Sequence, residues 1–436
     1  MSNRKRVWFE DTGRKLDPGL VEQLRVNRKD DPDETSHREI PIIVYFKKNC
    51  EKEKKDDLIQ ICNTDSHNKL DRELRSVNGA HGHLTPGMIK HIKDHEAVER
   101  IFYDRIVTAF LDVASKQIGA TTVHEKQGLT GKDVTMAIID TGVYPHEDFT
   151  KPTNRIVAFK DFVNDREDPY DDNGHGTHCA GDAAGNGHMS DQKYVGPAPD
   201  ALIIGLKVLD ENGSGRLSTI MEGIEWCIDH KQEYNIKIIS LSLGAPAYES
   251  FRDDPLSLTA QDAWHNGIVV CAAAGNSGPA ASTISTPAID PFIITVGSTD
   301  DQDTLERADD VIADYSSRGP TIDTFVKPDI YSPGTNIIAA LAPGSALETQ
   351  LPEQITDVNY IQLSGTSMAT PICAGVIALM LEANPNLSPN DIKSILKATS
   401  HPTLDDLWGY IHVESAVDMA KKYLNPVSPE VSLEGG

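Results

Sequence analysis

Three short segments of this chain each set one reactive side chain among small residues. Asp140 ends the apolar run in Ile-Ile-Asp-Thr-Gly, His175 lies in Gly-His-Gly-Thr-His, and Ser367 lies in Gly-Thr-Ser-Met-Ala. A carboxylate can orient an imidazole and stabilise its charged form, the imidazole can take the proton of a hydroxyl, and the hydroxyl can then attack a carbonyl carbon. The segments therefore supply the acid, base and nucleophile of a hydrolytic triad, in the order Asp, His, Ser.

These residues also have interpretations without this chemistry. An aspartate after a strand commonly forms a turn, and a serine before a helix commonly caps it. His175, His178 and Cys179 are metal-ligand types, but no further ligand stands at zinc-like spacing and His-Glu-x-x-His is absent from the sequence. The motif around Ser367 is Gly-x-Ser-x-Ala and the acid precedes the base, which disfavours an α/β-hydrolase. Two alternatives to a triad hydrolase stay open. One is a metal-dependent hydrolase, and the other is a non-enzymatic protein that binds peptides on the same fold (a pseudoprotease).

Buried strands must hold these side chains in place. Apolar, β-branched runs without alternation predict strands that are buried on both faces, as in a parallel sheet covered by helices. The runs are 134–139, 202–209, 236–241, 268–273 and 292–296. The clearest helices are 217–230 and the apolar stretch after Ser367. We expect an α/β fold, a doubly wound and mainly parallel sheet, with the reactive residues at the carboxyl ends of strands.

The first part of the chain has a different pattern. Residues 1–37 are rich in charge and predict an extended or partly helical arm. Residues 38–110 follow the order strand, helix, strands, helix, strand, with Thr85 capping the second helix. This order predicts a small α+β domain. We expect a large domain over residues 111–424 and a disordered tail over residues 425–436.

Composition narrows the classes of function. The 436 residues carry a net charge of -25, which argues against a nucleic-acid partner and against an anionic membrane surface. We see no apolar stretch of membrane-spanning length, and the basic amino terminus lacks the apolar core of a secretory signal. The six cysteines lack paired spacing, so we interpret them as free thiols of a cytoplasmic protein.

The three motifs in this order resemble the subtilisin-like serine proteases (subtilases) over residues 117–423, and most of all their intracellular AprX type. The resemblance implies a serine endopeptidase in which Ser367 attacks, His175 moves the proton and Asp140 orients the imidazole. It also implies that the Asn276 amide and the Ser367 backbone N–H hold the oxyanion. The α+β domain would then be a ferredoxin-like propeptide that covers the cleft and inhibits the enzyme.

The same resemblance places the peptide-binding segments. Two of them would pair with an extended substrate, and these are Gly213-Ser214-Gly215 and Ser242-Leu243-Gly244. Ala274 and Gly275, with the stretch around Ser285, would line the pocket for the residue before the scissile bond (P1). No acidic residue stands at these positions, so we expect apolar or medium-sized P1 residues.

Further expectations come from the family. Catalysis needs no cofactor, but Asp148 matches an aspartate that binds structural calcium in many subtilases, although the loop 185–193 departs from the family pattern. Aligning residue 117 with the start of the mature domain places self-cleavage between residues 107 and 116, where Phe110-Leu111 suits an apolar pocket. The expected partners are protein or peptide substrates and the chain's own propeptide.

Overall fold

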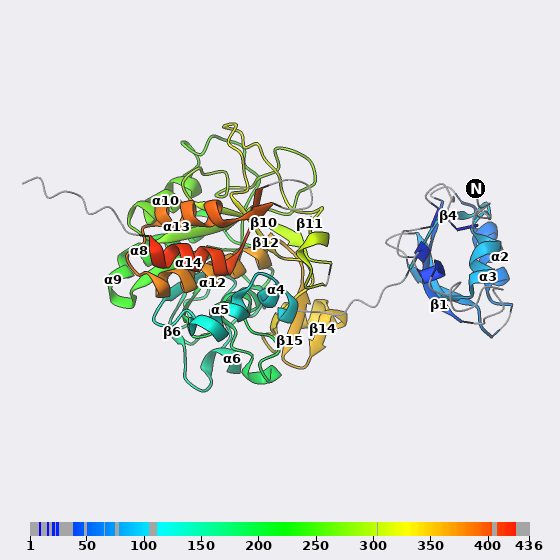
Figure 1. Cartoon of the computed structure of the whole chain (residues 1–436), viewed down its shortest axis with the longest axis horizontal. Coiled ribbons are helices and arrows are strands. Elements are labelled where there is room, and N and C mark those ends of the chain that lie inside the picture. The colour runs from blue at the N-terminus through cyan, green and yellow to red at the C-terminus, as the bar shows by residue number, and fades with distance from the viewer. Residues whose placement is uncertain are drawn as a thin grey trace, which may run out of the picture. The chain divides into compact units, whose positions relative to one another are not determined.

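The computed structural model describes residues 8–9, 15–16, 20–21, 23–25, 38–47, 50–64, 66–74, 78–103, 111–302, 304–402 and 408–423. The chain divides into two compact units, residues 1–107 and 108–436 (Figure 1). The expected tail over residues 425–436 lies outside the described residues.

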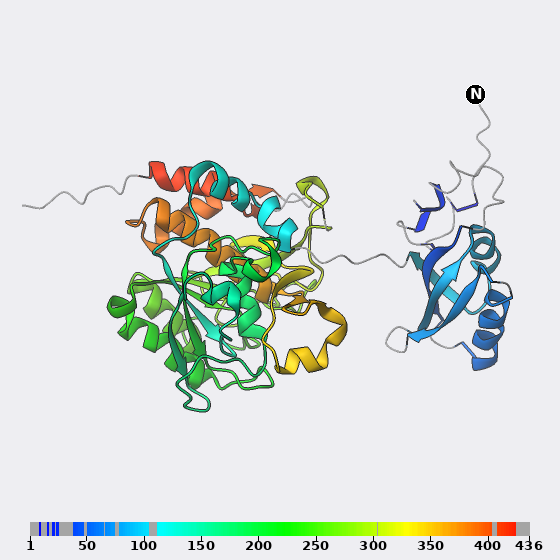
Figure 2. The same cartoon turned by 90° about the horizontal axis from the view of Figure 1, so that it is seen from below.

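The first unit is an antiparallel sheet with two helices on one side. Its elements are β1 (Ile40–Phe46), α2 (Lys52–Cys62), β2 (Lys69–Leu74), β3 (Gly79–Leu84), α3 (Pro86–Ile92) and β4 (Val98–Tyr103). The strands lie in the order β2-β3-β1-β4, and every pairing is antiparallel. Figures 1 and 2 show α2 and α3 together on one side of this sheet. This is the strand and helix order of a ferredoxin-like domain. The predicted cap of α3 is confirmed, because the Thr85 side chain accepts a hydrogen bond from Met88 N.

The charged segment before residue 38 contributes to the core of this unit. Four of its described apolar side chains are buried there, Phe9, Leu16, Leu20 and Leu24, and Trp8 and Val21 pack against this core while partly exposed. Leu16 pairs in parallel with Ile101 of β4, whose N–H donates to the Lys15 carbonyl at 2.8 Å. The described residues of the predicted arm, residues 1–37, therefore belong to the same compact unit as the α+β elements that follow. A few apolar residues spaced through a charged segment were enough to give it a buried face.

The second unit is built on a mainly parallel sheet of ten strands. The strands lie in the order β16-β17-β12-β10-β9-β8-β5-β7-β6, with β11 beside β10. Among the described strands of this sheet, β11 and β16 alone run antiparallel to their neighbours. In chain order the strands are β5 (Thr135–Asp140), β6 (Ile156–Asp161), β7 (Leu202–Lys207), β8 (Ile236–Leu241), β9 (Val269–Ala273), β10 (Ile294–Asp300), β11 (Val311–Ile312), β12 (Ile330–Pro333), β16 (His401–Pro402) and β17 (Trp408–Tyr410). The five predicted strands are confirmed, with some ends shifted by a few residues.

Helices cover this sheet on both faces, since every residue of β5 and of β9 is buried. The helices are α4 (Leu111–Gln117), α5 (Ala120–Gln127), α6 (Glu147–Thr150), α7 (His175–Ala184), α8 (Leu217–Asp229), α9 (Lys231–Tyr234), α10 (Pro255–His265), α11 (Ala346–Gln350), α12 (Thr366–Ala383), α13 (Pro389–Thr399) and α14 (Val413–Lys422). α7 packs against α12, and α8 packs against α10. A small antiparallel sheet lies beside α7 and consists of β13 (Ile337–Ala340), β14 (Ile355–Asp357) and β15 (Tyr360–Leu363).

The helix α12 forms the centre of the second unit. Among the described residues it is the one helix that is long and apolar enough to cross a membrane by length and composition. The sequence analysis predicted a helix after Ser367 but did not count it as a stretch of membrane-spanning length. It is 83% buried inside the unit and packs against β8, β9, β10 and β12. Its apolar character is therefore that of a core helix.

Candidate active site

Asp140 is the last residue of β5 and is fully buried. Its Oδ1 accepts hydrogen bonds from Thr141 N at 2.8 Å and from His175 Nδ1 at 2.7 Å. The chain turns away at Gly142, where φ is +125° and a Cβ atom would lie 2.2 Å from the Tyr170 carbonyl oxygen. Only glycine fits this turn. The carboxylate is thus held at a fixed point at the end of the strand.

A second buried aspartate fixes the loop that leads into α7. Asp171 accepts hydrogen bonds from Gly174 N at 2.8 Å and from N and Oγ1 of Thr177 at 2.8 and 2.7 Å. Burial raises the pKa of Asp171. These bonds cap the first turn of α7 and set the direction in which His175 leaves the helix. The sequence analysis missed Asp171, although an aspartate shortly before a helix start is a capping signal.

Lys207 joins the loop of Asp140 to the loop of His175. Its side chain is fully buried at the end of β7, and Nζ donates to the carbonyl oxygens of Thr141 and Leu209, both at 2.8 Å. A third hydrogen bond goes to Asp172 Oδ1 at 2.6 Å. Thr141 follows the acid and Asp172 precedes the base, so one ammonium group ties the two loops together. All three of its protons have acceptors, as a buried charge requires. The sequence analysis did not assign a role to Lys207. The signal that could have indicated one is a lysine at the end of an otherwise apolar strand.

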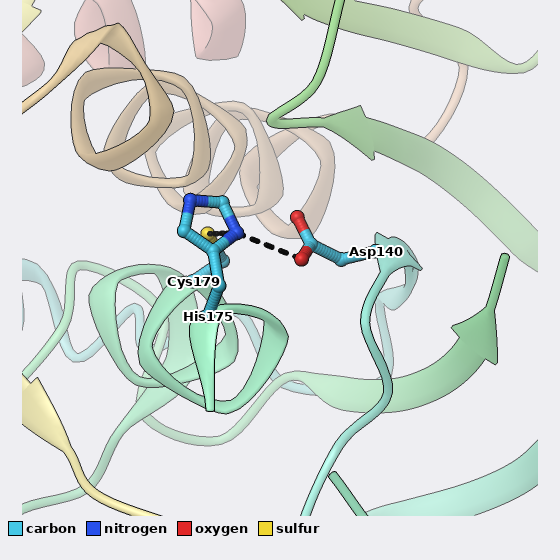
Figure 3. Close-up of side chains that lie close together, drawn as sticks. All are labelled: Asp140, His175 and Cys179. Atoms are coloured by element: carbon cyan, nitrogen blue, oxygen red, sulfur yellow. Dashed lines mark hydrogen bonds and ion pairs between the residues drawn. The ribbon is translucent and has the colours of Figure 1, made fainter. Parts of the chain in front are cut away.

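The imidazole of His175 lies between Asp140 and the sulfur of Cys179, one helical turn further along α7 (Figure 3). The side chain of His175 is 25% exposed. Burial acts to lower the pKa of His175, but the Asp140 carboxylate outweighs it, and the pKa is raised well above its ordinary value of 6.5. Cys179 Sγ lies 3.8 Å from His175 Nδ1 and 3.5 Å from the Ser367 carbonyl oxygen. The thiol thus packs behind the imidazole and against the first turn of α12.

Ser367 is the second residue of α12. Its Oγ donates a hydrogen bond to the Ser242 carbonyl oxygen at 3.1 Å, and its own carbonyl accepts one from Ser242 Oγ at 2.8 Å. Between the described residues Ser367 and His175 there is no hydrogen bond. Cys179 contacts both of them, and α7 packs against α12. The structure therefore brings the three side chains to one site, with the hydroxyl turned toward Ser242.

Asn276 follows β9 and faces the start of α12. Its Oδ1 accepts hydrogen bonds from N and Oγ1 of Thr366, at 2.9 and 3.0 Å. Because the side-chain oxygen is used in this way, the Nδ2 amide is the end that can donate to a ligand. A Cβ atom on Gly365 would lie 3.2 Å from Nδ2, so the amide stands close to the backbone just before Ser367. Thr366, which sets this orientation, was not assigned a role from the sequence.

Two cavities, each of about 430 Å³, lie on either side of the segment Ser242–Gly244. The first is lined by Ser367, Asn276, Gly275 and Ser285 together with this segment, and its lining includes no charged side chain. The second is lined by His175, Gly213, Ser214, Gly215 and Leu217 together with the same segment. The predicted peptide-binding residues other than Ala274 thus meet around one cleft.

Ala274 is the one predicted lining residue that lies elsewhere. It is fully buried and lines neither cavity. Its N–H donates to the Val296 carbonyl at 2.9 Å, and its carbonyl accepts a hydrogen bond from Ser285 N at 3.0 Å. Ala274 therefore stands behind the wall of the first cavity and holds Ser285 in it.

Asp148 does not fit the calcium site that the family resemblance implies. Its side chain is 1% exposed, and its Oδ1 and Oδ2 lie 3.0 and 2.9 Å from the Tyr360 hydroxyl, which donates to them. Oδ1 also accepts a hydrogen bond from Met189 N at 2.9 Å. Burial raises the pKa of Tyr360, as does the neighbouring carboxylate, so the hydroxyl stays protonated. Calcium needs about six to eight oxygen ligands, and a cation at Asp148 would have to displace Tyr360.

His178 does not join His175 in a metal site. It is fully buried, with Nδ1 3.0 Å from Asp182 Oδ2 and Nε2 3.1 and 3.0 Å from carbonyl oxygens of β13 and β15. It therefore holds α7 against the small sheet. Within the described residues, the one group of three metal-ligand side chains close enough to share an ion is Asp140, His175 and Cys179. That group is the hydrogen-bonded acid and base with the thiol behind them.

Comparison with known proteins identifies the family. The model of the Subtilase family matches residues 131–418, which is more than half of the chain. The chain belongs to the subtilase family. The serine protease AprX of Bacillus subtilis (strain 168) is 42% identical over 369 residues, which are 83% of each chain. Subtilisin E of the same strain is 32% identical over 354 residues, which are 80% of this chain and 81% of subtilisin E.

Solved structures agree with this assignment. Sphericase is 31% identical with a TM-score of 0.52, covering 66% of this chain and 91% of that chain. A cold adapted subtilisin-like serine proteinase is 30% identical with a TM-score of 0.51, covering 65% and 90%. This subtilase therefore has the subtilisin-like α/β fold, with the antiparallel α+β region before it, and is a subtilisin-like serine protease. The alternative interpretations, a metal-dependent hydrolase and a pseudoprotease, are wrong.

Proposed function

We propose that this serine protease cleaves peptide bonds through Asp140, His175 and Ser367 and an acyl-enzyme intermediate. The Ser367 hydroxyl attacks the substrate carbonyl carbon while His175 Nε2 accepts its proton, and His175 then gives that proton to the leaving amine. Asp140 stays ionised and stabilises the imidazolium. Water then attacks the acyl carbon and gives a proton to His175 Nε2. The bond between the acyl carbon and Ser367 Oγ breaks as His175 returns this proton to Oγ, and the acid product leaves.

The observation that carries this proposal is the 2.7 Å hydrogen bond between Asp140 and His175. It keeps the ring proton on Nδ1 and leaves Nε2 as the acceptor. The raised pKa of His175 has the same origin, because the Asp140 carboxylate stabilises the imidazolium that forms when the Ser367 proton is transferred. Ser367 has to turn its hydroxyl from Ser242 to Nε2, and such bonds often form fully only when substrate is bound.

The oxyanion would be held by the Asn276 amide and the Ser367 backbone N–H. The amide orientation fixed by Thr366 supports this role, as does the position of Ser367 in the first turn of the 18-residue helix α12, where backbone N–H groups favour negative charge. The first cavity would receive the P1 side chain. Because no charged side chain lines it, we propose a broad preference for apolar or medium-sized P1 residues.

Covalent labelling tests the triad. A fluorophosphonate should modify Ser367 alone, found by peptide mass spectrometry, and should abolish casein hydrolysis. Ser367→Ala should be inactive and unlabelled. Ser364→Ala is the matched control in the same motif, because Ser364 is exposed and its Oγ accepts a hydrogen bond from Asn336 N at 2.8 Å. This variant should keep both labelling and activity. Hydrolysis by the Ser367→Ala variant, or labelling at another serine, would refute the assignment.

The chain would be made as a self-processing zymogen. The two compact units support this, because the division between them along the chain, after residue 107, lies at the start of the predicted window for the cut, residues 107 to 116. The predicted site Phe110-Leu111 includes a residue outside the described ones. The purified wild-type chain should yield two fragments with a new amino terminus in this window, and Ser367→Ala should stay one chain. Spontaneous cutting of Ser367→Ala would contradict self-cleavage.

The free thiols support a proposed location, and the cleft supports the proposed partners. All six cysteines are unpaired, and five of them are buried. Unpaired thiols are typical of a reducing compartment, so the proposed location is the cytoplasm. The proposed partners are protein or peptide substrates and the first unit of the chain itself, acting as an inhibitor of the cleft.

A further inference from the structure

The short helix α11 is fastened to the loop that precedes His175. The backbone N–H groups of Ala346 and Leu347 donate to the carbonyl oxygens of Asp172 and Asn173, at 2.8 and 3.0 Å. Ser345, which is buried, caps α11 by accepting a hydrogen bond from Glu348 N. These hydrogen bonds therefore fix the start of α11 against the loop that leads into His175.

These bonds bring the side chain of Leu347 to the cleft. Leu347 is half-buried and lines the second cavity together with Asn173 and His175. A Cβ atom on Gly174 would lie 3.4 Å from Leu347 Cβ, so the leucine packs directly against the residue before His175. The lining of this cavity also includes five further aliphatic side chains, Leu209, Leu217, Ile220, Leu243 and Leu256.

The geometry of an extended peptide decides which substrate residue meets Leu347. Side chains of a strand alternate between its two sides. If the P1 side chain enters the first cavity beside Ser285, the P2 and P4 side chains point into the second. His175 marks the end of that cavity nearest the scissile bond, and Leu347 lies at this end. Leu217, Ile220 and Leu256, on or beside α8 and α10, belong to the part farther along the cleft.

We propose that Leu347 forms a wall of the P2 subsite and makes this protease select aliphatic side chains at P2. This inference rests on the proposed function of the cleft. The wall comes from α11, a segment that is distant in sequence from the two strand-pairing segments and that was not assigned any role from the sequence. Contact with an aliphatic P2 residue excludes water beside His175, whereas glycine at P2 leaves this space unfilled.

The test compares peptides that differ only at P2, with glycine, alanine, valine, leucine and lysine at that position and one apolar P1 residue. For the wild-type enzyme kcat/KM should be higher with leucine than with glycine at P2. In Leu347→Ala this ratio should fall about tenfold, as expected for partial loss of an apolar pocket. In a second series that varies only the P1 residue, the ratios of kcat/KM should be the same in wild type and Leu347→Ala. The control Leu258→Ala removes a leucine on α10 that is 45% exposed and lines neither cavity, and it should behave as wild type.

A second variant protects the test against a general loss of structure. Leu347→Glu should raise kcat/KM for the peptide with lysine at P2 relative to wild type, and a damaged enzyme cannot produce such a gain. Equal P2 ratios in wild type and Leu347→Ala, or no gain with Leu347→Glu, would overturn the subsite while leaving the protease assignment intact. Failure of the wild type to cleave any of the peptides would overturn the proposed function and the subsite together.

Discussion

The hydrogen bond from Tyr360 gives the buried Asp148 carboxylate a donor within the protein, and we predict that the loop around it does not depend on a metal ion. Tyr360→Phe removes the donor to a carboxylate that is 1% exposed and leaves Met189 N–H as its remaining donor. The phenyl ring keeps the aromatic contacts with His146 and Tyr194, whose centroids lie 5.5 and 4.8 Å away, so no cavity forms. The variant thus isolates the effect of one hydroxyl.

The expected loss follows from the charge of the acceptor. A hydrogen bond to a charged group contributes about 1.5–3 kcal/mol to stability. Removing one donor from a buried carboxylate should cost an amount toward the upper end of this range, because water cannot replace the donor. We expect the free energy of unfolding to fall by about 2 kcal/mol in Tyr360→Phe. Urea denaturation measures this in the Ser367→Ala background, which prevents self-digestion during the experiment. Tyr194→Phe is the control, because its hydroxyl is bonded to the Lys193 ammonium rather than to a buried carboxylate, and it should lose less.

Unfolding in the presence and absence of calcium tests whether Asp148 is paired with Tyr360 or binds a cation. The unfolding midpoint of the parent should be the same in EDTA and in millimolar calcium, because Tyr360 occupies the position that a cation would need. If EDTA destabilises the parent and Asp148→Asn abolishes that sensitivity, calcium binds at Asp148 and the reasoning is refuted. EDTA sensitivity that persists in Asp148→Asn comes from another site.

Three further predictions concern the site and the core. Asn276→Ala should lower kcat by ~10²–10³ with little change in KM, the loss known for such a donor in subtilisin; a change confined to KM would contradict an oxyanion role. An organomercurial should inactivate the enzyme slowly, because burial hides Cys179 and raises its pKa to about 11, whereas Cys179→Ser should resist it; equal sensitivity of the two would exclude this thiol. Burial lowers the pKa of Lys327 from 10.5 to about 7. Between these values the unfolded chain binds more protons, so the free energy of unfolding of Ser367→Ala should rise with pH above 7, by up to ~1.4 kcal/mol per pH unit for one proton. Lys327→Met should reduce this slope, and an unchanged slope would assign it to other groups.

The strands could be predicted from the sequence because burial on both faces leaves a continuous apolar run. The run that ends at Asp140 is buried throughout, as the pattern indicated. The motif around Ser367 could be placed at the start of a helix for a similar reason, since the apolar stretch after it is the buried helix α12. Local pattern and tertiary burial coincide at these positions.

Other features depend on partners that are far away in the sequence. The bond between Asp148 and Tyr360 joins residues 212 positions apart, and no local pattern reveals that this carboxylate accepts a hydrogen bond from a tyrosine hydroxyl. The local sequence indicates only that Lys207 is a polar residue at the end of a strand. In the structure its side chain links the loops of the acid and the base. The sequence around Leu347 does not distinguish it from any other single apolar residue between predicted elements. Its place beside His175 comes from two backbone bonds to a segment more than 170 residues earlier.

Within the proposed function, the Ser367 hydroxyl links substrate binding to activation of the nucleophile. Asp140 and His175 are held by buried groups whose hydrogen bonds are complete before any substrate arrives. Ser367 Oγ, by contrast, donates to the carbonyl oxygen of Ser242. That carbonyl belongs to a segment that would pair with the substrate backbone, and a substrate N–H that takes it as acceptor competes with the hydroxyl. The released hydroxyl can then turn to His175. The fold thus prepares the acid and base, and the bound peptide completes the last hydrogen bond of the triad.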